Sequence, residues 1–124
     1  MAGPYSGIRV VDTTGLSGAY ATRLLAGLGA EVIRLEAPDG SPLRRLGPFA
    51  ENIDAPENSL WWSYLAMGSH SVVIDPQDTE ALMQLLATAD VVFEDQLPEK
   101  STLPPGEISP TTIRTKILPF GSSG

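Results

Sequence analysis

Carboxylates at the ends of apolar runs are the side chains with the clearest potential for chemistry in this sequence. Asp12 ends the run 8–12, and Glu94 and Asp95 end the run 91–95. If these runs are parallel strands, the carboxylates lie at the edge where open α/β sheets bind ligands. The alternative for each is a turn or capping carboxylate. Glu94 and Asp95 point to opposite faces while the strand lasts, so they form no obvious acid–base pair.

Other catalytic and metal-ligating residue types are scarce. His70 is the only histidine, so the chain alone cannot build a catalytic triad or a multi-histidine metal site. We expect this histidine to be structural or exposed. The absence of cysteine removes disulfides, thiol nucleophiles and cysteine metal sites. No metal-ligand spacing is present, so we predict no metal.

The turn after the first run is a candidate anion site. Its residues 13–18, TTGLSG, contain turn formers and a candidate N-cap, Ser17, before a helix that we expect at 18–28. Backbone N–H groups at a helix N-terminus commonly hold phosphate groups. The turn therefore indicates a ligand-binding role rather than a catalytic one.

Strand-like and helix-like periodicities alternate along the chain. They predict an α/β fold, a Rossmann-like open parallel sheet of about five strands with crossover helices. The expected strands are 8–12, 31–36, 71–75, 91–95 and 113–118, and the expected helices are 18–28, 60–67 and 76–90. The segment 37–58 is rich in Pro, Gly, Asn and Asp, and we expect a loop that contacts a ligand or acts as a lid.

Apolar stripes predict which side of each helix packs inward. For the first helix the stripe is Tyr20, Leu24, Leu25 and Leu28, and for the last it is Leu82, Leu85 and Leu86. In the short helix 60–67 the shared face is Leu60, Trp61, Tyr64 and Leu65. We expect the tryptophans to anchor this helix rather than bind a ligand.

Composition narrows the class of partner. The chain has 124 residues, which we interpret as one domain, 1–124, and a net charge of −7 that argues against a nucleic-acid partner. No membrane span or signal peptide is evident, so we expect a cytoplasmic protein. Three arginines near the second strand could support an anionic ligand or be solvated surface charges; they are Arg34, Arg44 and Arg45.

A dinucleotide site is one candidate for the turn. Glu36 ends the second strand 21 residues after Gly15, close to the position of the acidic ribose ligand in nicotinamide-binding folds. The turn reads GxxG rather than GxGxxG, and Tyr20 stands where the third glycine would lie. Nicotinamide binding is therefore the least favoured interpretation.

Four segments in order carry a family resemblance: MAGPYSGIRVVDTT, SGAYATRLLAGLGAEVIRLEAPDGSPLR, SVVIDPQDTEAL and ADVVFEDQLPE. They resemble the N-terminal part of the class III CoA-transferases, a family that includes formyl-CoA transferases, carnitine CoA-transferases and α-methylacyl-CoA racemases. The final ILPFGSSG resembles the glycine-rich stretch after the next strand of the family. This resemblance implies a CoA thioester at the carboxyl edge of a Rossmann-like sheet, in longer proteins that form interlocked dimers.

The resemblance also implies roles for particular residues. In the transferases an aspartate forms an acyl anhydride, and in the racemases a histidine and an aspartate exchange the α-proton. Both correspond to positions beyond Gly124, so no catalytic residue is implied here and the chain alone is expected to be inactive. The implied CoA contacts follow the strands in pairs: Leu16 and Ser17, Ala37 and Pro38, Asp75 and Pro76, Asp95 and Gln96.

The chain departs from the family pattern where positive charge is expected. AMGSHSV stands where the family has NRGKRSV, and EDQLPE stands where it has ENFRPG. Our leading hypothesis is an N-terminal domain, cut off before the catalytic segment, that binds CoA or an acyl-CoA and joins a second copy or a C-terminal part. The alternatives are a non-catalytic interaction or scaffold domain with the same fold and, less favoured, a nicotinamide-binding half-domain.

Overall fold

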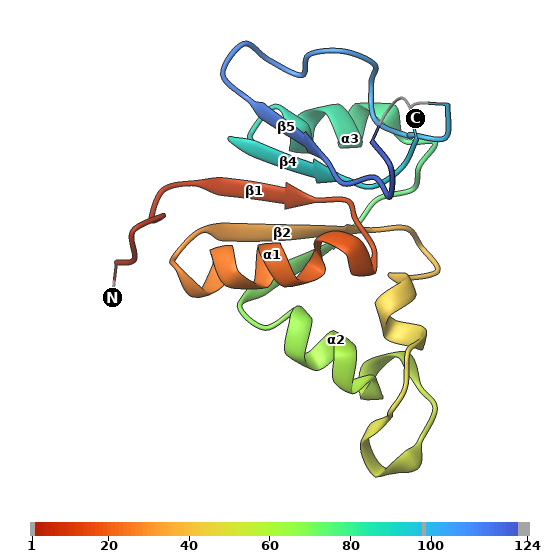
Figure 1. The fold of residues 1–124 in the computed structure, drawn as a ribbon. Helices are drawn as coiled ribbons and strands as arrows, with labels where there is room; N and C mark the ends of the chain where they lie inside the picture. Colours follow the sequence, from red (N-terminus) through yellow and green to blue (C-terminus); the bar gives the residue numbers. More distant parts are fainter. Residues whose placement is uncertain (1, 98, 122–124) are drawn as a thin grey trace.

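The protein is built around an open sheet of five parallel strands in the order β3-β2-β1-β4-β5 (Figure 1). The computed structural model describes residues 2–97 and 99–121. The strands are β1 (Arg9–Asp12), β2 (Glu31–Glu36), β3 (Ser69–Val73), β4 (Val91–Glu94) and β5 (Ile113–Lys116). The predicted α/β class with an open parallel sheet is confirmed.

Helices connect most of the strands. They are α1 (Leu16–Gly27) between β1 and β2, α2 (Leu60–Leu65) before β3, and α3 (Thr79–Leu86) between β3 and β4. Three short 3₁₀ helices interrupt the predicted loop 37–58: η1 (Pro42–Arg45), η2 (Ala50–Asn52) and η3 (Pro56–Asn58). The connection from β4 to β5 contains no helix among its described residues. Its buried Leu103 and partly buried Ile108 pack on the sheet instead.

Some predicted boundaries were wrong. Helix α1 begins at Leu16, because Gly15 rather than Ser17 is the N-cap, and no side-chain hydrogen bond caps it. Strand β3 covers Ser69–Val73 instead of 71–75, since its polar first residues pair with β2 at the edge of the sheet. The histidine of this strand, His70, is exposed, as expected.

The two faces of the sheet form separate apolar cores. Because side chains alternate along a strand, Val11 packs with Leu82 and Leu86 of α3, whereas Val10 packs with Leu25 and Ala26 of α1. The predicted stripe of α3 is confirmed, since Leu82 and Leu86 are 3% and 0% exposed and Leu85 is partly buried.

The predicted stripe of α1 was mostly wrong. Tyr20, Leu24 and Leu28 are 56%, 49% and 43% exposed, and of this stripe only Leu25 packs on the core. The buried residues of α1 are small: Gly18, Ala19 and Thr22. A Cβ on Gly18 would lie 2.4 Å from the Thr14 hydroxyl oxygen. Small residues therefore let α1 approach the sheet more closely than large ones could.

The apolar face predicted for α2 was also wrong in part. Leu65 is buried, but Leu60, Trp61 and Tyr64 are exposed. The expectation that tryptophan anchors this helix holds for Trp62, which packs against the cluster of Ala19, Leu43 and Leu65. Trp61 lies outside this cluster.

Candidate functional site

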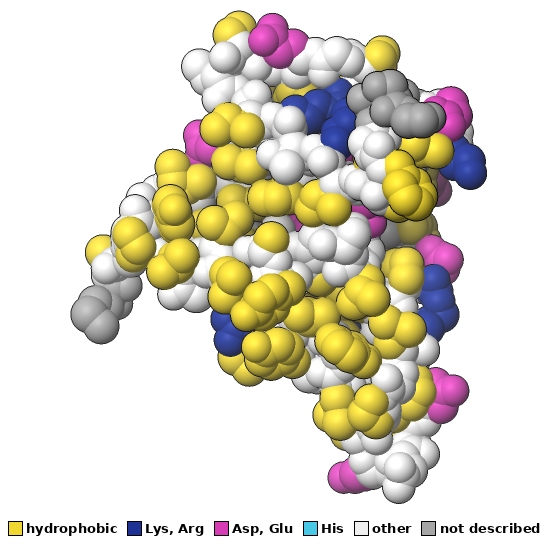
Figure 2. All heavy atoms as spheres, viewed as in Figure 1, with side chains coloured by type: hydrophobic (Ala, Val, Ile, Leu, Met, Phe, Trp, Pro, Cys, Tyr) yellow, Lys and Arg dark blue, Asp and Glu magenta, His cyan; other side chains and the backbone are white. Residues whose placement is uncertain are grey.

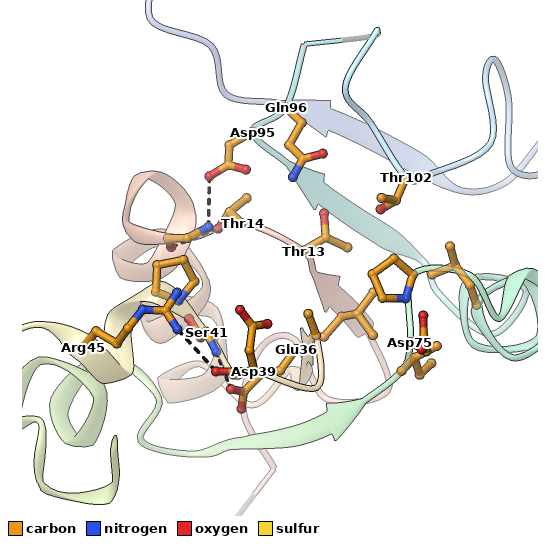
Figure 3. Close-up of a pocket in the computed structure, with 18 residues that line it drawn as sticks. Thr13, Thr14, Glu36, Asp39, Ser41, Arg45, Asp75, Asp95, Gln96 and Thr102 are labelled. Carbon is orange, nitrogen blue, oxygen red and sulfur yellow. Dashed lines mark hydrogen bonds between the residues drawn. The ribbon is translucent and has the colours of Figure 1, made fainter. Parts of the chain in front are cut away.

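A cavity of about 340 Å³ lies at the carboxyl ends of β1, β2, β3 and β4 (Figure 3). From β1 the chain proceeds to β2 and β3 on one side, and it then crosses to β4 and β5 on the other. At such a switch point the loops diverge and leave a crevice, which is where open α/β sheets bind ligands. The topology alone therefore makes this cavity the main candidate site.

Five of the eight predicted contact residues line this cavity: Ala37, Asp75, Pro76, Asp95 and Gln96. Leu16, Ser17 and Pro38 do not line it, because the first two already belong to α1 and Pro38 is exposed to solvent. Ser17 is linked to the site indirectly, since its hydroxyl donates a hydrogen bond of 2.8 Å to Asp95 Oδ2.

The cavity is also lined by residues outside these eight, most of them in the turn 13–18 and the segment 37–58, which the sequence already marks as candidate ligand contacts. Among them are Thr13, Thr14 and Gly15 after β1, Asp39, Ser41 and Arg45 after β2, and Thr102 from the β4–β5 connection. The threonines follow β1 directly, so their position after a predicted strand was an available signal. Thr102 carried no such signal, because an irregular connection has no periodicity to place it.

Asp12 lies under α1 instead of in the cavity. It is 1% exposed, and its Oδ2 accepts hydrogen bonds from Arg34 Nη1 at 2.9 Å and from the Thr22 hydroxyl at 2.6 Å. Its Oδ1 accepts the Thr14 N–H at 2.8 Å. Burial lowers the pKa of Arg34, although the neighbouring Asp12 carboxylate opposes that effect. This ion pair is structural, so the interpretation of Asp12 as a turn carboxylate is the correct one.

Glu36 borders the cavity, but its carboxylate is fully engaged. Oε2 accepts the Ser41 N–H and Arg44 Nε, each at 2.7 Å, and Oε1 accepts Arg44 Nη2 at 2.7 Å and the Ser71 hydroxyl. Burial would raise the pKa of Glu36, but the hydrogen bonds from Arg44, Ser71 and Ser41 outweigh it and lower the pKa to about 2. A ribose hydroxyl would have to displace one of these donors, which argues against the nicotinamide alternative.

Glu94 and Asp95 lie in different surroundings, in agreement with the prediction that they form no acid–base pair. Glu94 is 1% exposed, and it accepts hydrogen bonds from Arg114 and lies 3.1 Å from Lys116 Nζ. Asp95 is partly exposed on the cavity wall. Of Asp12, Glu94 and Asp95, only Asp95 lines the candidate site.

Charge on the cavity walls is mostly negative. Arg34 is buried with Asp12, and Arg44 pairs with Glu36 and stacks 3.7 Å from the Trp62 ring centre. Neither arginine lines the cavity, and the interpretation of these two as solvated surface charges was wrong. Arg45 lines the cavity, where its Nη1 donates to the Asp39 carbonyl at 3.3 Å (Figure 3).

Three wall carboxylates form no ion pair within the described residues: Asp39, Asp75 and Asp95. Arg45 is the one basic side chain among the described residues of the wall. An anionic ligand would therefore meet a wall of net negative charge.

A second, more open cavity of about 480 Å³ adjoins the first. It shares Asp95 and Gln96 with the first cavity and adds Lys100 and apolar residues that include Leu118 and Phe120. In the described ranges no three potential ligands (His, Cys, Asp or Glu) are grouped to hold a metal ion. Nor does any helix there have the length and apolar character to cross a membrane.

Comparison with known proteins identifies relatives over the whole chain. It is 35% identical to the succinyl-CoA:(R)-benzylsuccinate CoA-transferase subunit BbsE of Thauera aromatica, over 100% of this chain and 32% of that protein. It is 38% identical to the succinyl-CoA–L-malate CoA-transferase alpha subunit of Chloroflexus aurantiacus, over 77% of this chain and 23% of that protein.

The fold agrees with these relatives. The crystal structure of a hypothetical protein (Rv3272) from Mycobacterium tuberculosis matches with a TM-score of 0.79 and 32% identity, over 99% of this chain and 36% of that one. The chain thus spans about a third of the length of these proteins. Residues 5–103 match the family model for CoA-transferase family III. The chain therefore belongs to CoA-transferase family III.

Proposed function

We propose that this chain is the N-terminal, CoA-binding portion of a family III CoA-transferase or acyl-CoA racemase homologue, with CoA or an acyl-CoA thioester bound in the cavity at the sheet edge. The observation that carries the proposal is the meeting of four loops, one after each of β1 to β4, around one cavity at the switch point. These are the loops to which the family resemblance assigns CoA contacts. Loop backbone atoms at this edge can bind a nucleotide even where side chains differ.

Affinity for CoA is expected to be modest. CoA carries several phosphate charges, and a close charge-assisted contact contributes about 1.5–3 kcal/mol. The first cavity offers only Arg45 among its described basic side chains, and the second offers Lys100. Micromolar binding is therefore the expected range, with the loop backbone supplying the remaining contacts.

Catalysis by this chain alone is not expected. Each buried carboxylate at the sheet edge is ion-paired: Asp12 with Arg34, Glu36 with Arg44, and Glu94 with Arg114. A carboxylate held by an arginine is stabilised as an anion and is a poor nucleophile. We infer that the acyl-carrying residue lies in the two thirds of the family's length to which this chain has no counterpart.

Exposed apolar side chains of two helices form a candidate contact surface. We call it the α1–α2 face; it consists of Leu16, Tyr20, Leu24 and Leu28 with Leu60, Trp61, Tyr64 and Met67. Figure 2 shows hydrophobic side chains gathered over this part of the molecule. Monomeric proteins rarely leave large apolar patches uncovered. We propose that a second copy, or the remaining part of a full-length protein, covers this face.

Titration calorimetry with CoA tests the proposed function. Saturable micromolar binding is expected, and Arg45→Ala should weaken it by about tenfold because one phosphate contact is lost. Arg9→Ala is the matched control, since Arg9 pairs with Glu31 at the opposite edge of the sheet. No heat change at millimolar CoA would contradict the proposal and favour the scaffold alternative. Equal weakening by both variants would place the site elsewhere.

The scaffold alternative has one observation in its favour, namely the negative charge of the cavity wall. It predicts that the domain binds neither CoA nor NAD while the α1–α2 face still associates. Light scattering separates these properties, because a monodisperse monomer would exclude a second copy as the partner of this face whether or not CoA binds.

A further inference from the structure

Asp95 is one of the two wall residues that both cavities share, and it lies at the start of α1. Its Oδ2 accepts two hydrogen bonds, from the backbone N–H of Gly15 at 2.9 Å and from the Ser17 hydroxyl at 2.8 Å. Gly15 is the N-cap of the twelve-residue helix α1. A phosphate bound at this helix terminus would use the same donors. The protein's own carboxylate therefore occupies the anion position at this end of the cavity.

The Asp95 carboxylate lies where the helix stabilises a negative charge and where no basic side chain of the described residues neutralises it. The positive end of the α1 dipole favours an anion at this point, and no Lys or Arg of the described chain pairs with this carboxylate. A phosphate next to Asp95 would meet an unneutralised negative charge at contact distance. Within the described residues the other oxygen, Oδ1, accepts no hydrogen bond. It is thus available to a donor on a ligand.

We propose that Asp95 is a specificity-determining residue of the cavity. It excludes phosphate from the start of α1 and accepts a hydrogen bond from a neutral amino or hydroxyl group. This inference rests on the proposed function, and it places the nucleoside part of CoA beside Asp95 and its phosphates toward Arg45. The residue therefore sets both the orientation and the modest affinity of the ligand.

The test compares Asp95→Asn with the wild type by calorimetry against inorganic pyrophosphate, CoA and adenosine. An asparagine oxygen still accepts the Gly15 N–H, so the fold is retained while the charge is removed. Affinity for pyrophosphate should rise about tenfold, because charge repulsion is replaced by neutral contact, and affinity for CoA should rise less, because its nucleoside loses the carboxylate acceptor. Affinity for adenosine should fall several-fold, because a neutral acceptor is weaker than a carboxylate. The gain for pyrophosphate should shrink as salt is raised.

Asp75→Asn is the matched control. It removes the same charge from the same cavity, but the Asp75 carboxylate accepts the Gln77 N–H at 2.8 Å and, among the described residues, forms no hydrogen bond with α1. Only a small gain for pyrophosphate is expected. Equal gains in the two variants, or no gain in a folded Asp95→Asn protein, would overturn the inference.

Failure of the proposed function gives a different result. If no protein binds CoA but Asp95→Asn gains pyrophosphate affinity, the role of Asp95 stands and the CoA proposal falls. If CoA binds the wild type but Asp95→Asn gains no affinity for pyrophosphate, the CoA proposal stands and the role of Asp95 falls. Should Asp95→Asn fail to fold, Asp95→Ser removes the same charge and keeps the Gly15 N–H and Ser17 hydroxyl donors in place. It should show the same direction of change, a gain for pyrophosphate, and a folded Asp95→Ser protein without that gain would overturn the inference.

Discussion

Helices α1 and α3 cover opposite faces of one sheet, but they do so with opposite kinds of residue. Helix α3 buries leucines, whereas α1 buries Gly18, Ala19 and Thr22 and turns its large side chains outward. The small residues let a charged side chain of the sheet bond directly to α1, since Arg34 Nη2 donates to the Ala19 carbonyl at 3.1 Å. The α3 face is thus completed within this chain, while the outer side of α1 remains available to a partner.

Truncating one leucine on α3 and one on α1 should give the largest difference in the free energy of unfolding between two variants. Leu86→Ala removes a fully buried side chain of α3 and should lower the free energy of unfolding by about 2–5 kcal/mol. Leu24→Ala on α1 is the matched control and should change it by less than about 1 kcal/mol. Urea denaturation of both proteins measures the effect. Similar losses in the two would show that the outer side of α1 is covered in solution.

Low pH should lower the free energy of unfolding by protonating Glu36, which lies on the polar face of the sheet that α1 covers. Its pKa is lowered to about 2 in the folded protein, so its contribution is complete above the unfolded pKa of about 4.3. This contribution is lost as the pH falls from about 4.5 toward 2 and amounts to about 2–3 kcal/mol. Glu36→Gln should therefore show a flatter fall in unfolding free energy across this window.

The exposed carboxylate Glu31, which pairs with Arg9, provides the control for this pH dependence. Glu31→Gln should leave the acid slope of the wild type nearly unchanged, because solvent screens an exposed ion pair. An acid slope that is the same with and without Glu36 would mean that its network does not stabilise the fold.

A larger side chain between α1 and the sheet should lower the free energy of unfolding by less than truncation of a buried leucine of α3. Ala19→Leu places a large side chain where α1 meets the sheet and should destabilise the protein by about 1–3 kcal/mol. Ala21→Leu, at an exposed position of the same helix, should be nearly neutral. Thermal unfolding followed by circular dichroism compares the two. A tolerated Ala19→Leu would show that α1 does not need small residues.

Charge on the α1–α2 face should have the smallest effect on folding and a clear effect on association. Leu24→Glu should change the unfolding free energy by less than about 0.5 kcal/mol, since the side chain is half exposed. It should shift the protein toward monomer in light scattering, because a buried charge opposes association. Glu80→Gln, on the outer side of α3, should leave the oligomeric state unchanged.

The order of strands and helices could be predicted because apolar periodicity follows secondary structure. The inward side of α3 followed from the same pattern. The inward side of α1 did not, since the buried cluster of Asp12, Thr22 and Arg34 occupies space that large apolar residues would otherwise fill. A pattern of hydrophobicity contains no information about such a polar contact.

The candidate site was predictable to the extent that it follows strand ends. Ala37, Asp75 and Asp95 each come after a strand, and all three line the cavity. Arg45 follows the second predicted strand and was a candidate to support an anionic ligand. Thr102 belongs to a segment without periodicity, so nothing local placed it at the site. Ser17 was assigned a capping role that Gly15 has, because capping depends on where the backbone leaves the strand.

The sequence by itself determined the family, the fold class and the edge of the sheet where the candidate site lies. Only the tertiary structure decided which carboxylates remain free at that edge. The register of the sheet sets Asp12 beside Arg34 and Glu94 beside Lys116, and the two residues of each pair are 22 positions apart in the sequence. Within each pair the basic side chain neutralises the carboxylate. Asp95 lies just beyond the last paired residue of β4 and reaches α1 instead. Because strand pairing ends one residue before Asp95, no basic residue of β5 lies opposite it. Its carboxylate therefore contributes a negative charge to the cavity wall.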